Sequence, residues 1–291
     1  MQRRPSRRSV LASAGTLALA GLAGCTSGDS DSTTAATTDA DTATGTDAAP
    51  TTESAASVDW SEVADFRTWL TAYSTLPSSN ARFDYQSVSV AQIVENGRTS
   101  FLNLSVENVD GTLVQSGNTI VLGSFNASAL ANAVEVSDGY EVTGEHAGFT
   151  TAEATERETE FALGEDAVLA GSDLAVWIDT HRGERDRLEE SDTVFTRIFE
   201  KLPERGIVAG QRGPPAGGEI DVEAIEAWGN SMASLDADTA TWVYALEPDT
   251  SDETVDELAD GLAASAFTDE VTDRSEDGRF VTFTATMADL G

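Results

Sequence analysis

The sequence predicts a mixed α+β fold in which helices pack against antiparallel sheets. Some stretches place apolar residues at helical spacing, whereas others alternate apolar residues with threonine, as a half-buried strand does. The clearest strand pattern follows Asp277-Gly278, where threonines separate Val281, Phe283, Ala285 and Met287. Residues 119–170 and 241–287 share an order of strand, capped helix, strand, strand. This order predicts two degenerate β-α-β-β units of the ferredoxin-like kind.

The first folded segment is expected to be a helix that begins at Asp59. Asp59 and Glu62 resemble a capping box, and Pro77 closes the pattern. The apolar residues at helical spacing are Trp60, Val63, Phe66, Trp69, Leu70 and Tyr73. Residues 82–125 then have strand character, with tight-turn dipeptides at Asn96-Gly97 and Asp110-Gly111. Within that stretch, Ala91–Glu95 fits a short helix as well as a strand.

The middle of the chain alternates between the two patterns. Ser128–Val136 is expected to be a short helix with Asn126 as its N-cap. The predicted strands are Tyr140–Ala152, Glu160–Leu163 and Ala167–Ala170. A longer helix is predicted at Thr193–Leu202, and Pro203 ends it. Its single apolar face consists of Val194, Phe195, Ile198, Phe199 and Leu202.

The last third begins with Gly206–Gly218, whose Gly-Pro-Pro and Gly-Gly sequences predict a connector. A helix is then expected along Val222, Ile225, Trp228, Met232 and Leu235, followed by a strand along Trp242, Tyr244 and Leu246. Thr250 and Glu253 predict the cap of another helix, with Val255, Leu258, Ala259 and Leu262 on its apolar face. The predicted division is a first α+β unit at 58–205, a connector at 206–218 and a smaller unit at 219–291. The alternative that both units pack together as a single domain is left open by the sequence.

The N-terminal residues indicate export and a lipid anchor. Arg7 and Arg8 precede Val10–Ala23, which is uncharged and too short to span a bilayer. This arrangement resembles a twin-arginine signal. The following Leu22-Ala23-Gly24-Cys25 resembles the lipobox of prokaryotic lipoproteins, in which the thiol carries the lipid. We therefore expect residues 1–24 to be a signal peptide and Cys25, the chain's single cysteine, to be lipidated.

The residues that follow Cys25 predict a tether. Residues 26–57 contain 10 Thr, 5 Ser, 8 Ala and 6 acidic residues. Such a segment has too little apolar surface to offset the entropy lost on ordering. We expect residues 25–57 to be a lipidated cysteine followed by a disordered linker.

The charge of the chain predicts a salt-rich environment. The formal net charge is −34, from 51 acidic and 17 basic residues, and Lys201 is the single lysine. Acidic groups at this density repel one another in dilute buffer, whereas molar salt shortens the Debye length to about 3 Å and screens them. The sequence also lacks the basic surface that nucleic acid requires, so no nucleic-acid partner is expected.

Together, the signal, lipobox, acidic linker and lysine-poor acidic domain resemble the exported lipoproteins of halophilic archaea, many of them of uncharacterised families. The resemblance implies a position on the extracellular face of the cytoplasmic membrane, held by lipid on Cys25. It implies no activity and no cofactor.

The sequence predicts no catalytic residue, no metal site and no cofactor. The histidines are His146, expected in a hairpin turn, and His181, which with Asp179 is expected in a surface turn. Neither has a partner at metal-ligand spacing. Gly229–Ala233 approaches the Gly-x-Ser-x-Gly elbow of α/β-hydrolases but lacks its last glycine. Because the chain has 51 acidic residues, the sequence does not single out any two of them as a general acid and a general base.

Asn103-Leu104-Ser105 and Asn126-Ala127-Ser128 match the N-glycosylation sequon, which suits an exported chain. The leading hypothesis is a lipid-anchored surface protein that binds a small ligand or a membrane-protein partner without catalysis. The alternatives are a secreted hydrolase that uses carboxylates and a structural component of the envelope.

Overall fold

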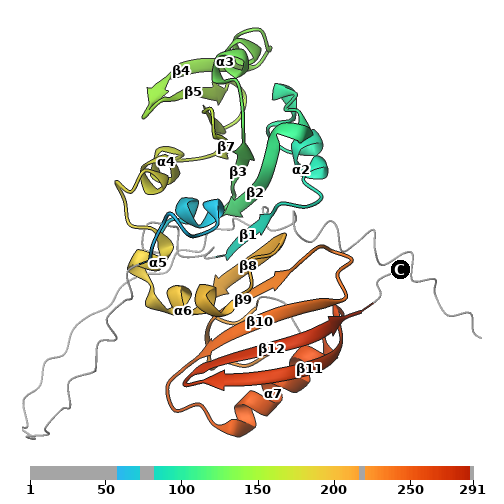
Figure 1. Ribbon diagram of the computed structural model, residues 1–291. Helices are drawn as coiled ribbons and strands as arrows, with labels where there is room; N and C mark the ends of the chain where they lie inside the picture. The colour runs from blue at the N-terminus through green and yellow to red at the C-terminus, as the bar shows by residue number, and fades with distance from the viewer. Residues whose placement is uncertain (1–57, 73–81, 216–219, 289–291) are drawn as a thin grey trace, which may run out of the picture. The chain divides into compact units, whose positions relative to one another are not determined.

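The structure is a computed structural model that describes residues 58–72, 82–215 and 220–288. The described residues form one compact unit. Its described strands form a single antiparallel sheet in the order β11-β12-β10-β9-β8-β1-β2-β3-β7-β6-β5-β4 (Figure 1). The chain therefore has the predicted α+β fold, with helices packed on an antiparallel sheet.

In the first half of the chain, the 3₁₀ helices are η2 (Asp65–Trp69), η4 (Ser100–Leu102) and η5 (Val106–Asn108). The α-helices are α2 (Ala91–Asn96) and α3 (Ala127–Glu135), so the open alternative at Ala91–Glu95 resolves as a helix. The strands are β1 (Arg82–Gln86), β2 (Val109–Gln115), β3 (Asn118–Gly123), β4 (Tyr140–His146), β5 (Phe149–Ala154), β6 (Glu160–Leu163) and β7 (Ala167–Gly171).

The second half begins with three helices, α4 (Ala175–His181), α5 (Leu188–Ser191) and α6 (Thr193–Lys201). The later helix is α7 (Asp252–Ala264). The strands are β8 (Ile207–Arg212), β9 (Ile225–Met232), β10 (Thr239–Leu246), β11 (Thr268–Asp277) and β12 (Phe280–Met287).

Both halves contain a split β-α-β unit, in which a helix joins two strands that other strands separate. In the second half, α7 follows β10 and leads to β11, and β12 returns to lie between them. In the first half, α3 follows β3 and leads to β4, and three strands fill the gap. The shared order of strand, capped helix, strand, strand is thus present in both halves. The halves join where β1 pairs with β8.

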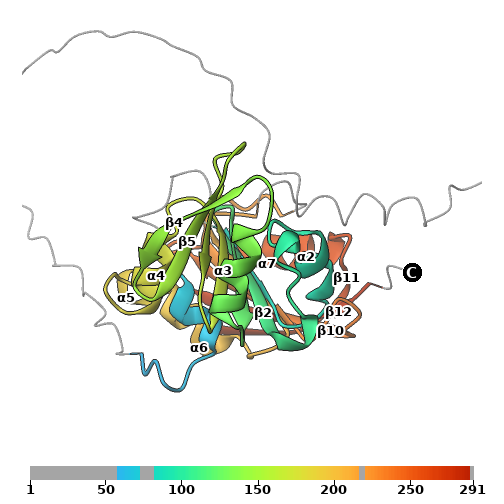
Figure 2. The same cartoon turned by 90° about the horizontal axis from the view of Figure 1, so that it is seen from above.

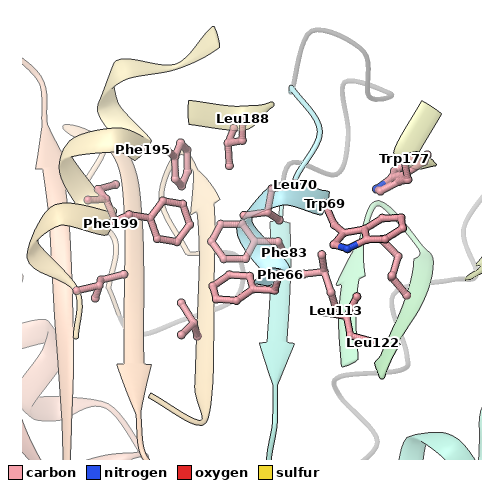
Figure 3. Close-up of a cluster of buried hydrophobic side chains, with 14 of the residues drawn as sticks. Phe66, Trp69, Leu70, Phe83, Leu113, Leu122, Trp177, Leu188, Phe195 and Phe199 are labelled. Carbon is pink, nitrogen blue, oxygen red and sulfur yellow. The ribbon is translucent and has the colours of Figure 1, made fainter. Parts of the chain in front are cut away.

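Helices cover both faces of the sheet. On one face, η2, α4, α5 and α6 contribute to a core cluster with residues of ten strands, and phenylalanines of η2, β1 and α6 lie close together in it (Figure 3). On the other face, α7 covers β9, β10, β11 and β12, while α2 and α3 cover strands of the first half. Figure 2 shows α4, α5 and α6 on the side of the sheet opposite α7.

One predicted helix cap is confirmed and another lies one residue away. The Asn126 side chain accepts a hydrogen bond from the backbone N–H of Ala129 at 3.0 Å, as expected for α3. Asp192 caps α6 by accepting from the N–H of Val194 at 3.1 Å. For α7 the cap is Ser251, one residue after the predicted Thr250. Each cap satisfies an N–H group that the helix itself leaves unpaired.

The predicted helix from Asp59 to Tyr73 is wrong over its described part. Only Asp65–Trp69 is helical there, as the 3₁₀ helix η2. The chain then becomes extended, because the backbone of Leu70 accepts a hydrogen bond from Leu188 and Ala72 donates one to Asp186. These long-range bonds override the local helical pattern. Tyr73 and Pro77 lie outside the described residues.

Two predictions about the last third are also wrong. Residues 222–235 were expected to form a helix, but Ile225–Met232 is strand β9, between β8 and β10. The expected connector at 206–218 contains strand β8, Ile207–Arg212, which pairs with both β1 and β9. Residues 206–215 therefore belong to the sheet and its margin, and no loop at β8 separates the two units.

Candidate functional site

The candidate site is built around α4, which packs against the sheet near its β4 edge. At the start of this helix, the Glu160 carboxylate accepts a hydrogen bond from the N–H of Leu174 at 3.1 Å. In its last turn, Asp179 Oδ1 lies 2.6 Å from His146 Nε2, at the end of β4. Asp179 Oδ2 also accepts from Arg185 at 3.4 Å. These bonds fix α4 on the hairpins formed by β4 to β7.

A pocket of about 240 Å³ opens between α4 and the outer strands. Its apolar wall comes from Leu174, Ala175 and Ile178 of α4 and its N-cap residue. The opposite side is polar and carries the side chains of Thr143, Glu145, His146, Thr151, Glu153 and Glu160. The pocket thus combines one apolar wall with several carboxylates, and we call it the α4 pocket.

Two of these carboxylates are neighbours by sheet register. Glu153 of β5 and Glu160 of β6 are directly paired across the two strands. Residues opposite each other in an antiparallel pair have Cβ atoms about 4.5–5.5 Å apart. Glu160 is held by its bond to Leu174, whereas Glu153 is exposed. Sequence reasoning missed this pair because its two members are separated by a turn and resemble the many other acidic residues.

His181 lies on the other side of the same helix turn. Its ring stacks on Trp69 with centroids 4.0 Å apart, and its Nδ1 lies 2.8 Å from Thr68 Oγ1. The Thr68 hydroxyl also donates to the Asp65 carbonyl at 2.7 Å. Asp166 Oδ2 is 3.5 Å from Nε2. The hydrogen bond from His181 lowers the pKa of Asp166, against the effect of partial burial.

Both histidines therefore pair with aspartates. His146 belongs to the expected hairpin, but it is the last residue of strand β4 and not part of the turn. Asp179 and His181 lie in helix α4 and not in a surface turn. Within the described residues, no group of three or more His, Cys, Asp or Glu side chains is arranged to hold a metal ion.

The near match to a hydrolase elbow has a structural role. Ser231 lies in strand β9, not at a strand-to-helix turn. Its side chain is buried, and its hydroxyl donates to the Pro203 carbonyl at 2.6 Å. This bond ties the end of α6 to the sheet. Gly229, two residues earlier, packs closely against α6. A Cβ atom added to Gly229 would lie 2.8 Å from the side chains of Ile198 and Leu202.

A second pocket, of about 260 Å³, brings the two sequons together. Asn103, which follows η4, and Asn126, which caps α3, both line it and both are exposed. The rest of the lining comes from Leu102, Leu104, Ser105, Asn108, Phe125, Ala129 and Leu130. We call it the sequon pocket.

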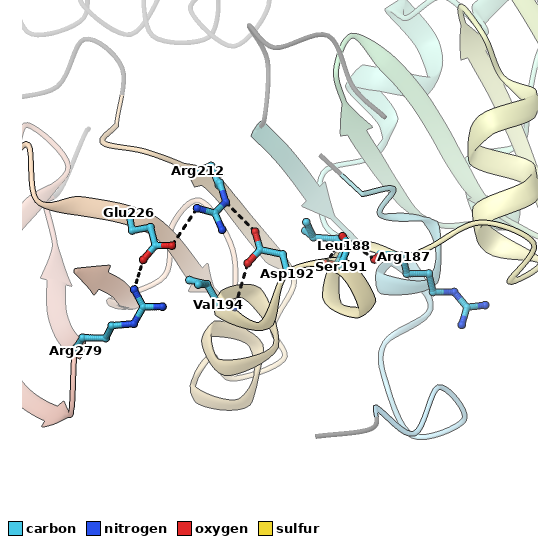
Figure 4. A network of polar contacts seen from close by, with 8 residues as sticks. All are labelled: Arg187, Leu188, Ser191, Asp192, Val194, Arg212, Glu226 and Arg279. Atoms are coloured by element: carbon cyan, nitrogen blue, oxygen red, sulfur yellow. Dashed lines mark hydrogen bonds and ion pairs between the residues drawn. The ribbon is translucent and has the colours of Figure 1, made fainter. Parts of the chain in front are cut away.

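The polar network at the start of α6 joins elements of the second half (Figure 4). Arg212 of β8 donates to Asp192 at 2.8 Å and to Glu226 of β9 at 3.1 Å. Glu226 also accepts from Arg279, which precedes β12. Every charged group in this chain of contacts has an opposite charge beside it, so its role is structural.

Arg7, Arg8 and Cys25 lie outside the described residues, so the export signal and the lipid anchor remain predictions. Across residues 58–72, 82–215 and 220–288, no helix is long and apolar enough to cross a membrane.

No protein-family model matches this chain. A search of curated proteins likewise found no match. Among solved structures, crystal form I of TP0453 is 12% identical, with a TM-score of 0.49, and the match covers 79% of this chain and 95% of that chain. Crystal form III of TP0453 is 11% identical, with a TM-score of 0.48, and the match covers 77% of this chain and 94% of that chain.

Proposed function

We propose that this chain is a lipid-anchored protein of the outer surface of the cytoplasmic membrane, and that its acidic α+β domain binds a ligand without catalysis. The N-terminal resemblance to halophilic lipoproteins supports the location, and the charge of −34 supports a salt-rich environment. The α4 pocket is the observation that carries the binding role.

The chemistry of the α4 pocket favours a small organic cation. Glu145, Glu153 and Glu160 give one side negative charge, and the exposed Ala175 gives the other an apolar surface beside the buried Leu174 and Ile178. A primary amine with a short hydrocarbon chain matches both sides. At molar salt, long-range attraction is screened, so contact between the ammonium and a carboxylate must act together with burial of the hydrocarbon.

The polar groups around α4 favour binding over catalysis. His146 is bonded to Asp179, and Glu160 is bonded to the backbone of Leu174. Among the described residues that line this pocket, none is a serine or a cysteine that His146 would activate. These groups hold α4 in place and leave Glu153 and Glu145 exposed to a ligand.

The test is equilibrium binding to the full-length chain, solubilised from membranes in detergent and kept in molar KCl. The ligands are n-alkylamines and the carboxylic acids of equal chain length. We expect saturable binding of amines, no binding of acids, and at least tenfold weaker amine binding after Glu153→Gln. Glu257→Gln, an exposed change on α7, is the control. Equal binding of amines and acids, or no effect of Glu153→Gln, would contradict the proposal.

The second candidate function is a carboxylate-dependent hydrolase, and the pairing of Glu153 with Glu160 in one pocket favours it. Retaining glycosidases use two carboxyl groups about 5–5.5 Å apart. Hydrolysis of aryl glycosides in molar salt that both Glu153→Gln and Glu160→Gln abolish, while Glu257→Gln does not, would establish it. Absence of turnover together with amine binding would leave the binding role.

A further inference from the structure

The two sequons meet at one place on the folded surface. The chain contains eight asparagines, and Asn103 and Asn126 are the two followed by x-Ser or x-Thr. Both line the sequon pocket, although the segments between them include strands β2 and β3. We propose that Asn103 and Asn126 both carry N-linked glycans, which flank this pocket on the exported protein.

Asn103 is presented on a turn. It follows η4, and its backbone has a φ of +50°, the left-handed region that asparagine tolerates better than most residues. Its side chain is exposed, and its one hydrogen bond here, from Nδ2 to the Phe101 carbonyl, is long at 3.3 Å. The amide nitrogen is therefore weakly held. Ser105, the hydroxyl residue of the sequon, is also exposed.

Asn126 has a second role as the cap of α3, but that role uses a different atom. Its Oδ1 accepts the hydrogen bond from Ala129, whereas a glycan is attached through Nδ2. A substituted amide keeps its carbonyl oxygen, so capping and glycosylation are compatible. Asn126 and Ser128 are both exposed.

The surface between the two asparagines suits a sugar. Leu104 and Phe125 line the pocket and are only partly buried. The C–H face of a pyranose packs favourably on apolar side chains of this kind. Exposure in the folded state matters because a twin-arginine route would deliver the chain already folded. The inference therefore rests on the proposed export, although not on the proposed ligand.

The modification is a group transfer from a glycan attached through its C1 carbon to a lipid phosphate or diphosphate. Nδ2 of asparagine forms a bond to C1 and loses one proton. The bond between C1 and the phosphate oxygen breaks, and the lipid phosphate leaves with that electron pair. A membrane enzyme that accepts folded chains at the outer surface supplies the catalysis.

The experiment is peptide mass spectrometry of the full chain purified from membranes of its native cell. We expect glycan mass increments on the peptides that contain Asn103 and Asn126. Asn103→Gln or Ser105→Ala should remove the first, and Asn126→Gln or Ser128→Ala the second. Asn132→Gln, an exposed change on α3 outside any sequon, should remove neither.

Unmodified peptides from chains recovered at the cell surface would overturn the proposal, as would a glycan that persists after Ser105→Ala and Ser128→Ala. The double variant Arg7→Lys with Arg8→Lys separates this inference from the proposed location. If export needs the arginine pair, that variant stays inside the cell and unglycosylated. A surface-located but unglycosylated native chain would refute the glycans while leaving the location intact.

Discussion

The buried ion pair between Arg67 and Glu189 offers the sharpest test of how the folded unit is held together. Arg67 Nε and Nη2 donate to the two oxygens of Glu189 at 2.8 and 2.7 Å. The side chains are 12% and 1% exposed. Desolvation raises the pKa of Glu189, although the hydrogen bonds from Arg67 oppose that rise. The pair joins η2 to α5, so the informative perturbation is Arg67→Met.

This substitution should cost about 3–5 kcal/mol, the range for breaking a buried ion pair by removing one partner. The cost arises because Glu189 stays buried without its counter-charge. The exposed pair between Arg82 and Asp84 is a matched control, since it has the same two-bond geometry but side chains 49% and 47% exposed. Arg82→Met should cost less than about 1 kcal/mol.

The effect should depend on pH in a defined direction. Without Arg67, the pKa of Glu189 rises further above its value in the unfolded chain. When the pKa of a carboxyl group is higher in the folded state than in the unfolded state, its contribution to stability is largest below the unfolded-state pKa. That contribution is lost as the pH rises through the folded-state pKa. The stability gap between Arg67→Met and the unchanged chain should therefore narrow as the pH falls from 7 towards 5. The double change Arg67→Met with Glu189→Leu should recover most of the loss.

The assay is urea unfolding, followed by circular dichroism, of full-length chains in molar KCl. At that salt concentration exposed pairs are screened and buried pairs much less so, which widens the expected contrast. A loss for Arg67→Met within about 0.5 kcal/mol of the Arg82→Met loss would refute the assignment of a buried, energetically coupled pair. A gap that stays constant from pH 7 to pH 5 would refute the further rise in the pKa of Glu189 in the variant.

Three further predictions concern the whole chain and the histidine pairs. The charge of −34 predicts a cooperative fold in molar KCl or NaCl that is lost on dialysis to dilute buffer, and a native circular dichroism spectrum in dilute buffer would contradict it. Cys25→Ser should release the protein from membranes on fractionation; retention in the membrane pellet would exclude the lipid anchor. His181→Asn should raise the pKa of Asp166, measured by carboxyl NMR, because it removes the hydrogen bond that lowers that pKa. Since the lowered pKa stabilises the fold above the unfolded pKa, the variant should lose more stability at neutral pH than at pH 2, where only the lost contacts with Trp69 and Thr68 count.

Much of the fold could be predicted where one face of an element is buried and the other exposed. Helices α6 and α7 carry a single apolar face, and β12 alternates apolar residues with threonine, so each shows its period in the sequence. The cap at Asn126 was predictable because it needs a local donor alone. The pairing of β1 with β8 had no comparable local sign, since the two strands are far apart in the chain.

Of the candidate site, the sequence identified the parts but not their partners. His146 and Asp179 were each noted, yet their contact depends on α4 packing against the β4 to β7 hairpins. Glu153 and Glu160 had no distinguishing feature among 51 acidic residues until the register of β5 and β6 paired them. The sequons gave the strongest local signal, but their shared pocket depends on the fold.

The two wrong predictions in the last third have a common physical cause. Strand β9 is buried on both faces, so its alternation of polar and apolar residues is lost, and Ile225, Trp228 and Met232 happen to fall at helical spacing. On the face that α6 covers, the strand has Gly229, because a Cβ there would lie 2.8 Å from Ile198 and Leu202. In β8, Gly210 likewise leaves room for the Phe83 ring, 2.8 Å from where its Cβ would be. Glycines that elsewhere mark turns thus mark close packing at the centre of this sheet. Sequence patterns identify strands by their bulky residues, which a strand with glycine at such positions lacks. The glycines in β8 and β9 are explained by close packing with residues that are distant in the sequence.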